Sequence, residues 1–113
     1  MNISFATKDL RKWANDDRKA LKDLGKVRAM LYKRRLTQMQ DAVTLEDVRF
    51  LAGNYHELKT TRKGQWGCDL DQPYRLVFKP QQNPIPENED GQYIWKEITG
   101  IEILDIINYH KEK

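Results

Sequence analysis

The chain begins with a short segment in which apolar and polar residues alternate. Within residues 2–5, Ile3 and Phe5 are apolar and the positions beside them are polar. Because successive side chains of a strand point to opposite faces, this alternation predicts a short strand with one buried face. Thr7 then has the character of a helix N-cap residue. The short helix predicted after it carries apolar side chains at Leu10, Trp13 and Ala14.

A helical period follows and continues to about Ala42. The acidic and amide residues at 15–17 can end the first helix and cap the next one. Apolar residues then recur at three- and four-residue spacing, which is typical of an amphipathic helix. They form two groups, Ala20, Leu24, Val27 and Leu31, then Tyr32, Leu36, Met39 and Val43. The groups are rotated by one residue, so the helix either buries a wide face or bends, and Gly25 is its weak point.

The next segment has the signature of a capping box, with Thr44 at the cap and Asp47 three residues later. It predicts a helix of one to two turns over residues 45–51, ended by Gly53-Asn54. The pattern then becomes that of strands. Residues 66–70 and 74–78 are expected to form a hairpin whose turn contains Pro73.

The C-terminal part combines a polar loop with the most apolar segment of the chain. Residues 80–91 contain three prolines and few apolar side chains, which predicts a surface loop. Residues 93–97 can add a short strand. Residues 101–109 carry apolar side chains on both faces, which indicates a central, buried strand. Asp105 is the exception within it, and needs either a partner or a solvated edge.

These elements predict an α+β fold over a single domain, residues 1–113. The N-terminal short strand and the helices are expected to pack on one face of a small, mostly antiparallel sheet. A content of 39% apolar and 33% charged residues excludes both a disordered chain and a membrane protein. The N-terminus lacks the apolar core of a signal peptide. The single cysteine, Cys68, cannot form an internal disulfide, so a cytoplasmic location is expected.

The distribution of charge is more informative than the net charge of +3. Residues 1–35 contain eleven Lys and Arg against four acidic residues, whereas residues 81–113 contain three against seven. A basic half of this kind can attract a polyanion such as nucleic acid. The competing interpretation is a solvated, lysine-rich helix face.

Several kinds of chemistry find no support in the sequence. The two histidines and the one cysteine occur in no metal-binding spacing, so no metal and no cofactor are expected. There is no glycine-rich phosphate loop, and Ser4 is the only serine, so a Ser/His/Asp triad has no nucleophile in a suitable context. Cys68 lies within an apolar strand and fits packing better than nucleophilic catalysis.

Two segments and one arginine remain as candidates. Residues 55–66 combine His56, three basic residues and a tryptophan, and the last strand runs out at Tyr109-His110. Arg75 is flanked by apolar residues, and a buried arginine usually pairs with an acid or binds an anion. Taken singly, each has a structural interpretation: His56 and His110 as loop and terminal histidines, and Arg75 as a partner of Asp105.

Together these pieces resemble a known family. The pattern His56-x-Leu58-Lys59-x-x-Arg62-x-Gly64-x-Trp66, then Tyr74-Arg75-Leu76-Val77-Phe78, then Asn108-Tyr109-His110 is similar to the HigB-type (plasmid maintenance killer) toxins of the RelE/ParE superfamily. Ile3-Ser4-Phe5 also resembles the first strand of that family. The resemblance covers residues 2–79 and 101–110, and residues 80–100 replace a tight turn. It implies a RelE-like fold in which residues 80–100 are a surface loop insertion.

The resemblance implies the toxin of a bacterial type II toxin–antitoxin system. Such a toxin is a metal-independent endoribonuclease that cuts mRNA, usually on the ribosome, and is neutralised in a hetero-oligomer by a HigA-type antitoxin. Histidine suits either proton role in attack by the 2′-hydroxyl, and cations stabilise the charged phosphorane. The candidates for catalysis are then His56, His110, Tyr109 and Arg75, and those for RNA and phosphate binding are Lys59, Arg62, Lys63, Trp66 and Asn108.

One position departs from the family pattern. The terminal motif of the family commonly has Asp where this chain has Asn108, and an amide can neither accept a proton nor carry charge. If the last strand continued through His110, Tyr109 and His110 would also point to opposite faces, so a bend is required. The alternatives are a non-catalytic RNA- or ribosome-binding module or degenerate toxin, a ParE-like gyrase inhibitor, and a DNA-binding regulator that uses the basic helices.

Overall fold

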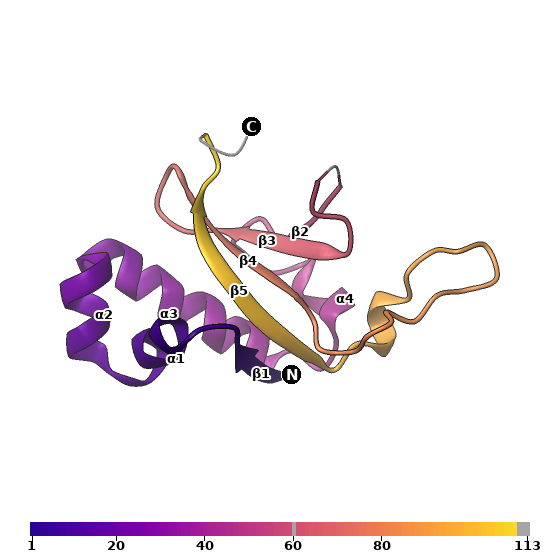
Figure 1. The fold of residues 1–113 in the computed structure, drawn as a ribbon, viewed down its shortest axis with the longest axis horizontal. Coiled ribbons are helices and arrows are strands. Elements are labelled where there is room, and N and C mark those ends of the chain that lie inside the picture. The colour runs from indigo at the N-terminus through magenta and orange to yellow at the C-terminus, as the bar shows by residue number, and fades with distance from the viewer. Residues whose placement is uncertain (60, 111–113) are drawn as a thin grey trace.

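The protein is built on a single five-stranded sheet covered on one face by helices (Figure 1). The computed structural model describes residues 1–59 and 61–110. The strand order is β1-β5-β4-β3-β2, with β1 parallel to β5 and the other neighbours antiparallel. The strands are β1 (Asn2–Phe5), β2 (His56–Leu58), β3 (Gln65–Asp69), β4 (Tyr74–Pro80) and β5 (Gly100–Asn108). The expected α+β class and the mostly antiparallel sheet are confirmed.

The helices come mainly from the first half of the chain. They are α1 (Lys8–Asn15), α2 (Asp17–Leu24), α3 (Lys26–Asp41) and α4 (Leu45–Val48), followed much later by the 3₁₀ helix η1 (Trp95–Glu97). Thr7 caps α1 by accepting a hydrogen bond from the Leu10 amide, and Asp16 caps α2 in the same way from Lys19. The capping box of Thr44 and Asp47 opens α4. The predicted helix starts are therefore confirmed.

Gly25 divides what the sequence predicts as one long helix. Its φ of +84° is in the region that favours glycine, and it ends α2 and begins α3. Burial differs between the two apolar groups within α3. Tyr32 and Met39 of α3 are fully buried in the core, whereas Val27 is 53% exposed. The first group is therefore divided between α2 and α3, and α3 points members of the second group, not one wide face, into the core.

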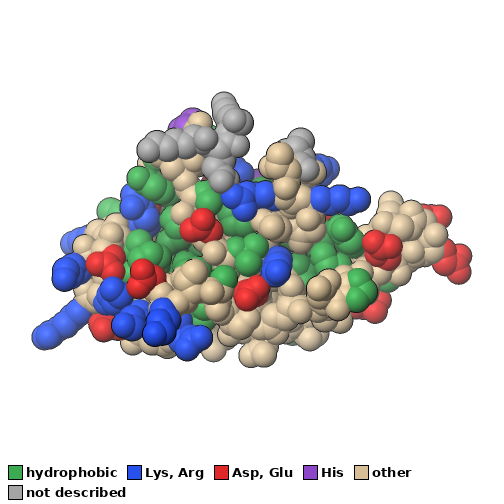
Figure 2. Space-filling model, in the orientation of Figure 1, with side chains coloured by type: hydrophobic (Ala, Val, Ile, Leu, Met, Phe, Trp, Pro, Cys, Tyr) green, Lys and Arg blue, Asp and Glu red, His purple; other side chains and the backbone are tan. Residues whose placement is uncertain are grey.

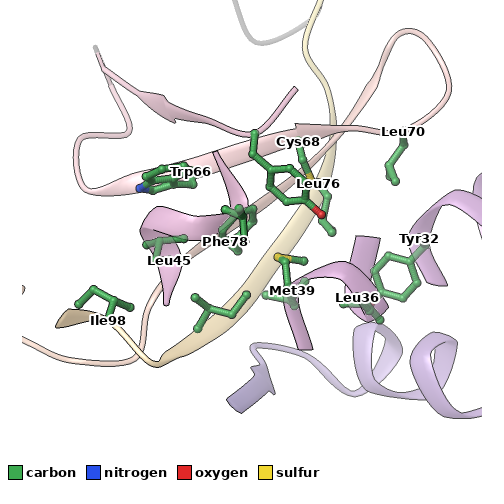
Figure 3. Close-up of a cluster of buried hydrophobic side chains, with 14 of the residues drawn as sticks. Tyr32, Leu36, Met39, Leu45, Trp66, Cys68, Leu70, Leu76, Phe78 and Ile98 are labelled. Carbon is green, nitrogen blue, oxygen red and sulfur yellow. The ribbon is translucent and has the colours of Figure 1, made fainter. Parts of the chain in front are cut away.

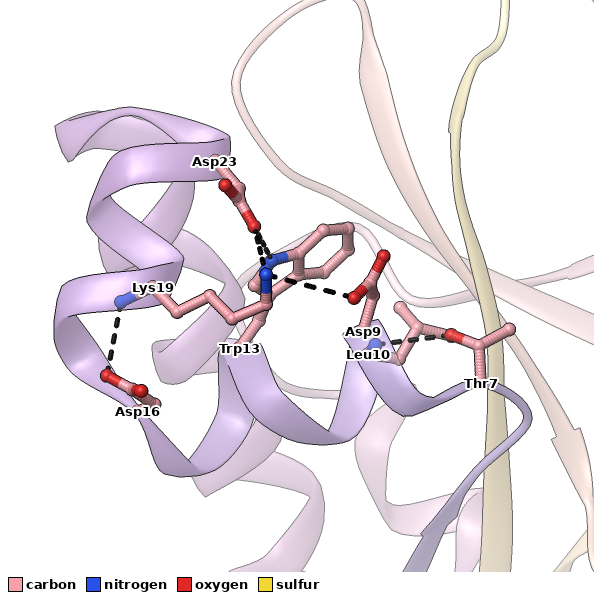
Figure 4. A network of polar contacts seen from close by, with 7 residues as sticks. All are labelled: Thr7, Asp9, Leu10, Trp13, Asp16, Lys19 and Asp23. Carbon is pink, nitrogen blue, oxygen red and sulfur yellow. Dashed lines mark hydrogen bonds and ion pairs between the residues drawn. The ribbon is translucent and has the colours of Figure 1, made fainter.

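A polar network fixes α1 against α2 (Figure 4). The indole N–H of Trp13 donates to Asp23 at 2.9 Å, and the ammonium of Lys19 donates to the same carboxylate at 2.9 Å. These two hydrogen bonds lower the pKa of Asp23 below its ordinary value. The ring of Trp13 also meets that of Tyr32 edge to face, with the centroids 6.4 Å apart. The pair of helices α1 and α2 therefore packs against α3 through Trp13.

The core lies between the helices and the inner face of the sheet (Figure 3). Alternate residues of β3, β4 and β5 point into it from the sheet, and α3 and α4 supply the opposing side chains. Its largest fully buried members are Trp66, Tyr32, Phe78, Met39, Leu45, Leu76, Ile98, Ile101 and Ile103. Strand β5 is central, as predicted, because it pairs with β1 on one side and β4 on the other.

Three local predictions need correction. The sequence assigns no strand of its own to the segment before the hairpin, but this segment contains the edge strand β2. Residues 93–97, expected as a short strand, instead contain η1, and the helix expected over residues 45–51 ends at Val48. The loop after β4 projects from the body of the molecule, as Figure 1 shows. Its turn is held by Asn88, whose side-chain oxygen accepts hydrogen bonds from the amides of Asp90 and Gln92.

Candidate functional site

The face of the sheet opposite the helices, here called the open face, carries most of the predicted catalytic residues. On β3, Trp66 points into the core, so its neighbour Gly67 lies on the open face. His56 is the strand partner of Gly67 and shares that face. Arg75 is the partner of Ile107 on β5 and lies on the open face as well. The fold therefore places His56 and Arg75 on the same side of the sheet.

The side chain of Arg75 extends across β3. A Cβ atom on Gly67 would lie 2.7 Å from the Cδ atom of Arg75, so only glycine leaves room for this path. The guanidinium carbon then lies 4.7 Å from the centre of the Tyr109 ring. The Nε atom is buried without a hydrogen-bond partner. A cation held in this way retains donor capacity for an anion.

The chain leaves β5 through a turn that directs both terminal rings to the same place. The amide of Tyr109 donates to the Pro73 carbonyl at 3.1 Å, and the amide of His110 donates to the side-chain oxygen of Asn108 at 3.2 Å. The rings of Tyr109 and His110 are stacked, with centroids 4.5 Å apart. The bend that the sequence required is therefore present, and Asn108 forms part of it.

His56 is oriented by the backbone just before it. Its Nδ1 atom lies 2.7 Å from the carbonyl oxygen of Asn54, a residue with a φ of +55°. Because a carbonyl only accepts, Nδ1 carries the proton in this contact, and the Nε2 atom of a neutral ring is then an acceptor. This tautomer can remove a proton from a hydroxyl group.

Most of the predicted RNA-binding residues lie farther along the molecule, around the β2–β3 turn. Lys59 and Lys63 line a cleft between β2 and the projecting loop, and Arg62 donates to Gln65 at 3.2 Å. Lys63 also borders a polar groove with Lys79 on the open face. Figure 2 shows several Lys and Arg side chains exposed along the upper part of the molecule.

Trp66 must be corrected as a candidate for stacking on a base. It is completely buried and packs edge to face on Trp95, with centroids 5.5 Å apart. The guanidinium of Arg49 lies 4.7 Å from its ring centre, on the helix side of the sheet. In this position the Trp66 ring is part of the core, and no face of it is exposed for stacking on a nucleobase.

The structural interpretation of Arg75 as a partner of Asp105 is also wrong. Asp105 is exposed and accepts a hydrogen bond from the amide of Ile106 at 2.8 Å. Among residues 1–59 and 61–110, no carboxylate lies within ion-pair distance of Arg75. The same part of the chain holds no group of three His, Cys, Asp or Glu side chains suited to a metal ion.

Cys68 is the only thiol and lies in the core. It is fully buried, and this burial raises its pKa to about 12. A thiol that stays protonated at neutral pH is a poor nucleophile. Its position agrees with the packing role expected from the strand context.

Sequence reasoning missed the residues that hold the site in place. Gly67 gives Arg75 its path, Asn54 orients His56, and Pro73 anchors Tyr109. A glycine in the middle of an apolar strand is a signal of close approach by another chain segment, and could have identified Gly67. The other two act through backbone carbonyls, for which side-chain identity gives no signal.

Comparison with protein-family models and with curated proteins finds no match for this chain. Within the described ranges, no helix combines the length and the apolar character needed to cross a bilayer.

Proposed function

We propose that the protein is a HigB-type endoribonuclease of the RelE/ParE superfamily, the toxin of a bacterial type II toxin–antitoxin system. The observation that carries the proposal is the convergence of Arg75 with the terminal rings of Tyr109 and His110 on the open face, which it shares with His56. This set contains two groups that can transfer protons, a cation and an aromatic surface. These are the requirements for cleaving RNA without a metal.

The proposed reaction is a transesterification within one nucleotide of mRNA. One histidine removes the proton from the 2′-hydroxyl, whose oxygen attacks the adjacent phosphorus. The bond from phosphorus to the 5′-oxygen breaks, and the other histidine protonates that leaving oxygen. The products are a 2′,3′-cyclic phosphate and a free 5′-hydroxyl. His56 and His110 can each take either role, since imidazole both donates and accepts near neutral pH.

Arg75 and Tyr109 have supporting roles in this proposal. The guanidinium stabilises the negative charge that gathers on the phosphoryl oxygens as the 2′-oxygen attacks. The Tyr109 ring, held between Arg75 and His110, orients both groups and can stack on a base. The basic turn at Lys59, Arg62 and Lys63 would bind the phosphates of the flanking strand.

The helical half of the chain supplies a separate basic surface. Eleven Lys and Arg residues lie in residues 1–35, and Figure 2 shows a group of them exposed away from the open face. We assign this surface to non-specific contact with ribosomal RNA, through phosphates. Neutralisation by a HigA-type antitoxin and a cytoplasmic location complete the proposal.

The test combines toxicity with direct cleavage. Induction of the wild-type chain without a partner should arrest growth, and the purified protein should cleave mRNA in the presence of EDTA, with or without ribosomes. His56→Ala and His110→Ala should each lower the cleavage rate by about 10²- to 10⁴-fold, the usual contribution of one general acid or base. Val43→Ala, at an exposed position on the other side of the core, is the control.

The outcomes separate the competing functions. Product ends other than a cyclic phosphate and a 5′-hydroxyl would exclude the proposed chemistry. Two histidine variants as active as wild type would show that the acid/base roles are wrong. RNA binding without cleavage favours the non-catalytic module, a possibility supported by Asn108 at the position of the family's Asp. Gyrase inhibition with intact mRNA favours the ParE-like function.

A further inference from the structure

A cleft that none of the catalytic residues lines lies between the edge strand β2 and the projecting loop. Its volume is about 540 Å³, within the range of roughly 300–1,000 Å³ typical of ligand sites. One wall comes from Leu58, Lys59 and Lys63, and the other from the loop and η1. The residues of the second wall are Asn88, Gly91, Gln92, Tyr93 and Trp95.

The second wall of the cleft is aromatic and the first wall carries positive charge. The rings of Tyr93 and Trp95 lie side by side with centroids 5.0 Å apart. The ammonium of Lys63 lies 5.9 Å from the centre of the Tyr93 ring, so a positive charge stands above an aromatic surface. Aromatic surfaces combined with cations are how proteins bind single-stranded nucleic acid with little sequence preference.

The acidic residues near the cleft do not oppose an anionic ligand. Among the residues that the structure describes, Glu57 is the only acidic one that lines the cleft, and it is ion-paired with Arg49 at 3.2 Å on the helix side of the sheet. The loop carries Glu89 and Asp90 at its tip, but every loop residue that lines the cleft is uncharged. None of the acidic residues of the loop therefore lines this surface.

The cleft is close to the candidate site along one strand. Leu58 lines the cleft and lies two residues after His56, on the same face of β2. Two residues of a strand span about 6.6 Å. A nucleotide next to one whose phosphate lies at His56 could therefore place its base over Tyr93.

We propose that this cleft binds one nucleobase of a single-stranded RNA, beside the nucleotide held at the open face. Tyr93 supplies the stacking surface, and Lys63 and Lys59 bind the phosphate that follows the base. Residues 80–100, which replace a tight turn in the resembling family, then form the outer wall of a substrate subsite. This inference deepens the proposed function and rests on it for the orientation of the RNA.

The test measures binding separately from cleavage. A fluorescein-labelled, single-stranded 2′-O-methyl RNA of mixed sequence cannot be cut, because its attacking oxygen is methylated, and its affinity is read by fluorescence anisotropy. Tyr93→Leu keeps an apolar side chain against Trp95 but removes the ring, and should weaken binding about tenfold. Lys63→Gln should also weaken binding. Tyr93→Phe keeps the ring and should bind within twofold of wild type.

A second aromatic deletion and a direct mapping experiment complete the design. Phe50 is 82% exposed and lies outside the cleft, so Phe50→Ala should leave affinity unchanged. RNA carrying 4-thiouridine should photocrosslink to Tyr93, Trp95 or Lys63 in the wild-type chain, which tests the site without any substitution. Wild-type affinity in Tyr93→Leu, or crosslinks confined to other residues, would overturn the inference.

The two proposals can fail independently. Binding that depends on Tyr93, together with no cleavage of unmodified RNA, would leave the cleft assigned and overturn the nuclease. Cleavage that is insensitive to Tyr93→Leu would leave the nuclease and overturn the cleft. A folded wild-type chain that binds no RNA would overturn both.

Discussion

Arg75 and Tyr109 form a cation–π pair, with the guanidinium carbon 4.7 Å from the ring centre. The two residues lie 34 positions apart in the sequence, and the β4–β5 pairing brings them together. The backbone amide of Tyr109 is anchored on Pro73, so the ring is positioned by the turn that precedes β4. The pair therefore couples the end of the chain to the centre of the candidate site.

Arg75 should be the most sensitive cationic position of the site. Its planar donor group is held by Gly67 and Tyr109, and a lysine cannot reproduce that geometry. We expect Arg75→Ala and Arg75→Lys both to reduce single-turnover cleavage of RNA, by about 10²- to 10³-fold for the alanine. Thermal unfolding should confirm that both variants are folded. Cleavage by Arg75→Lys at the wild-type rate would show that charge alone suffices.

Gly67 should act through Arg75. An alanine there places its Cβ atom 2.7 Å from Arg75 Cδ, so the arginine side chain must move off β3. We expect Gly67→Ala to lower cleavage by about tenfold or more, as a misplacement of about 1 Å can do. The double variant Gly67→Ala/Arg75→Ala should be no slower than Arg75→Ala alone, because the glycine acts only by positioning the arginine. Additive losses in the double variant would contradict this explanation.

The parts of the fold that the sequence predicted are those set by local chemistry. Thr7, Asp16 and Thr44 cap helices because their side chains satisfy amides that the helix leaves free. Strand β5 was recognisable because a central strand is apolar on both faces. Such signals lie within a few residues of each other and do not depend on the rest of the chain.

The missed features depend on distant partners. Strand β2 is three residues long, and pairing with β3 rather than its own composition makes it a strand. Trp66 lies in a motif that resembles an RNA-binding segment. Because successive residues of β3 point to opposite faces of the sheet, its side chain points into the core. In the candidate site, the residue types were predictable and their convergence was not, because it requires the register of β4 with β5 and the turn at Asn108.

Cys68 should be inert in the folded protein. Burial keeps its thiol protonated by raising the pKa to about 12. Iodoacetamide at pH 8 should therefore label Cys68 only in denaturant, as read by mass spectrometry. The unfolded thiol ionises near its ordinary pKa, so its contribution to stability is complete below about pH 9 and declines as the pH rises toward 12. Burial also raises the pKa of Tyr32 and Tyr55. Their contributions to stability therefore also decline as the pH rises.

That alkaline loss has its own control. Cys68→Ala removes the thiol. The free energy of unfolding of this variant should therefore fall less steeply between pH 9 and pH 10.5 than that of wild type. The missing sulfur atom lowers the stability of the variant at pH 7, but it does not affect this slope. Urea titrations across this range measure the slope. Equal slopes for the two proteins, or rapid labelling of the native chain at pH 8, would show that the thiol is not buried as the structure describes.

Asn108 holds the turn that stacks His110 on Tyr109, because its side-chain oxygen accepts the hydrogen bond from the His110 amide. Asn108→Asp keeps this acceptor. Asn108→Ala removes it, so the His110 ring is no longer held against Tyr109. We expect Asn108→Ala to reduce cleavage about as much as His110→Ala, by about 10²-fold or more, since a displaced group loses its proton-transfer role.

Asn108→Asp should retain at least wild-type activity. A carboxylate beside His110 also favours the imidazolium, so the pH–rate profile of this variant should shift to higher pH. An Asn108→Ala enzyme as fast as wild type would mean that the turn does not position His110, and that the histidine acts from a mobile end or not at all.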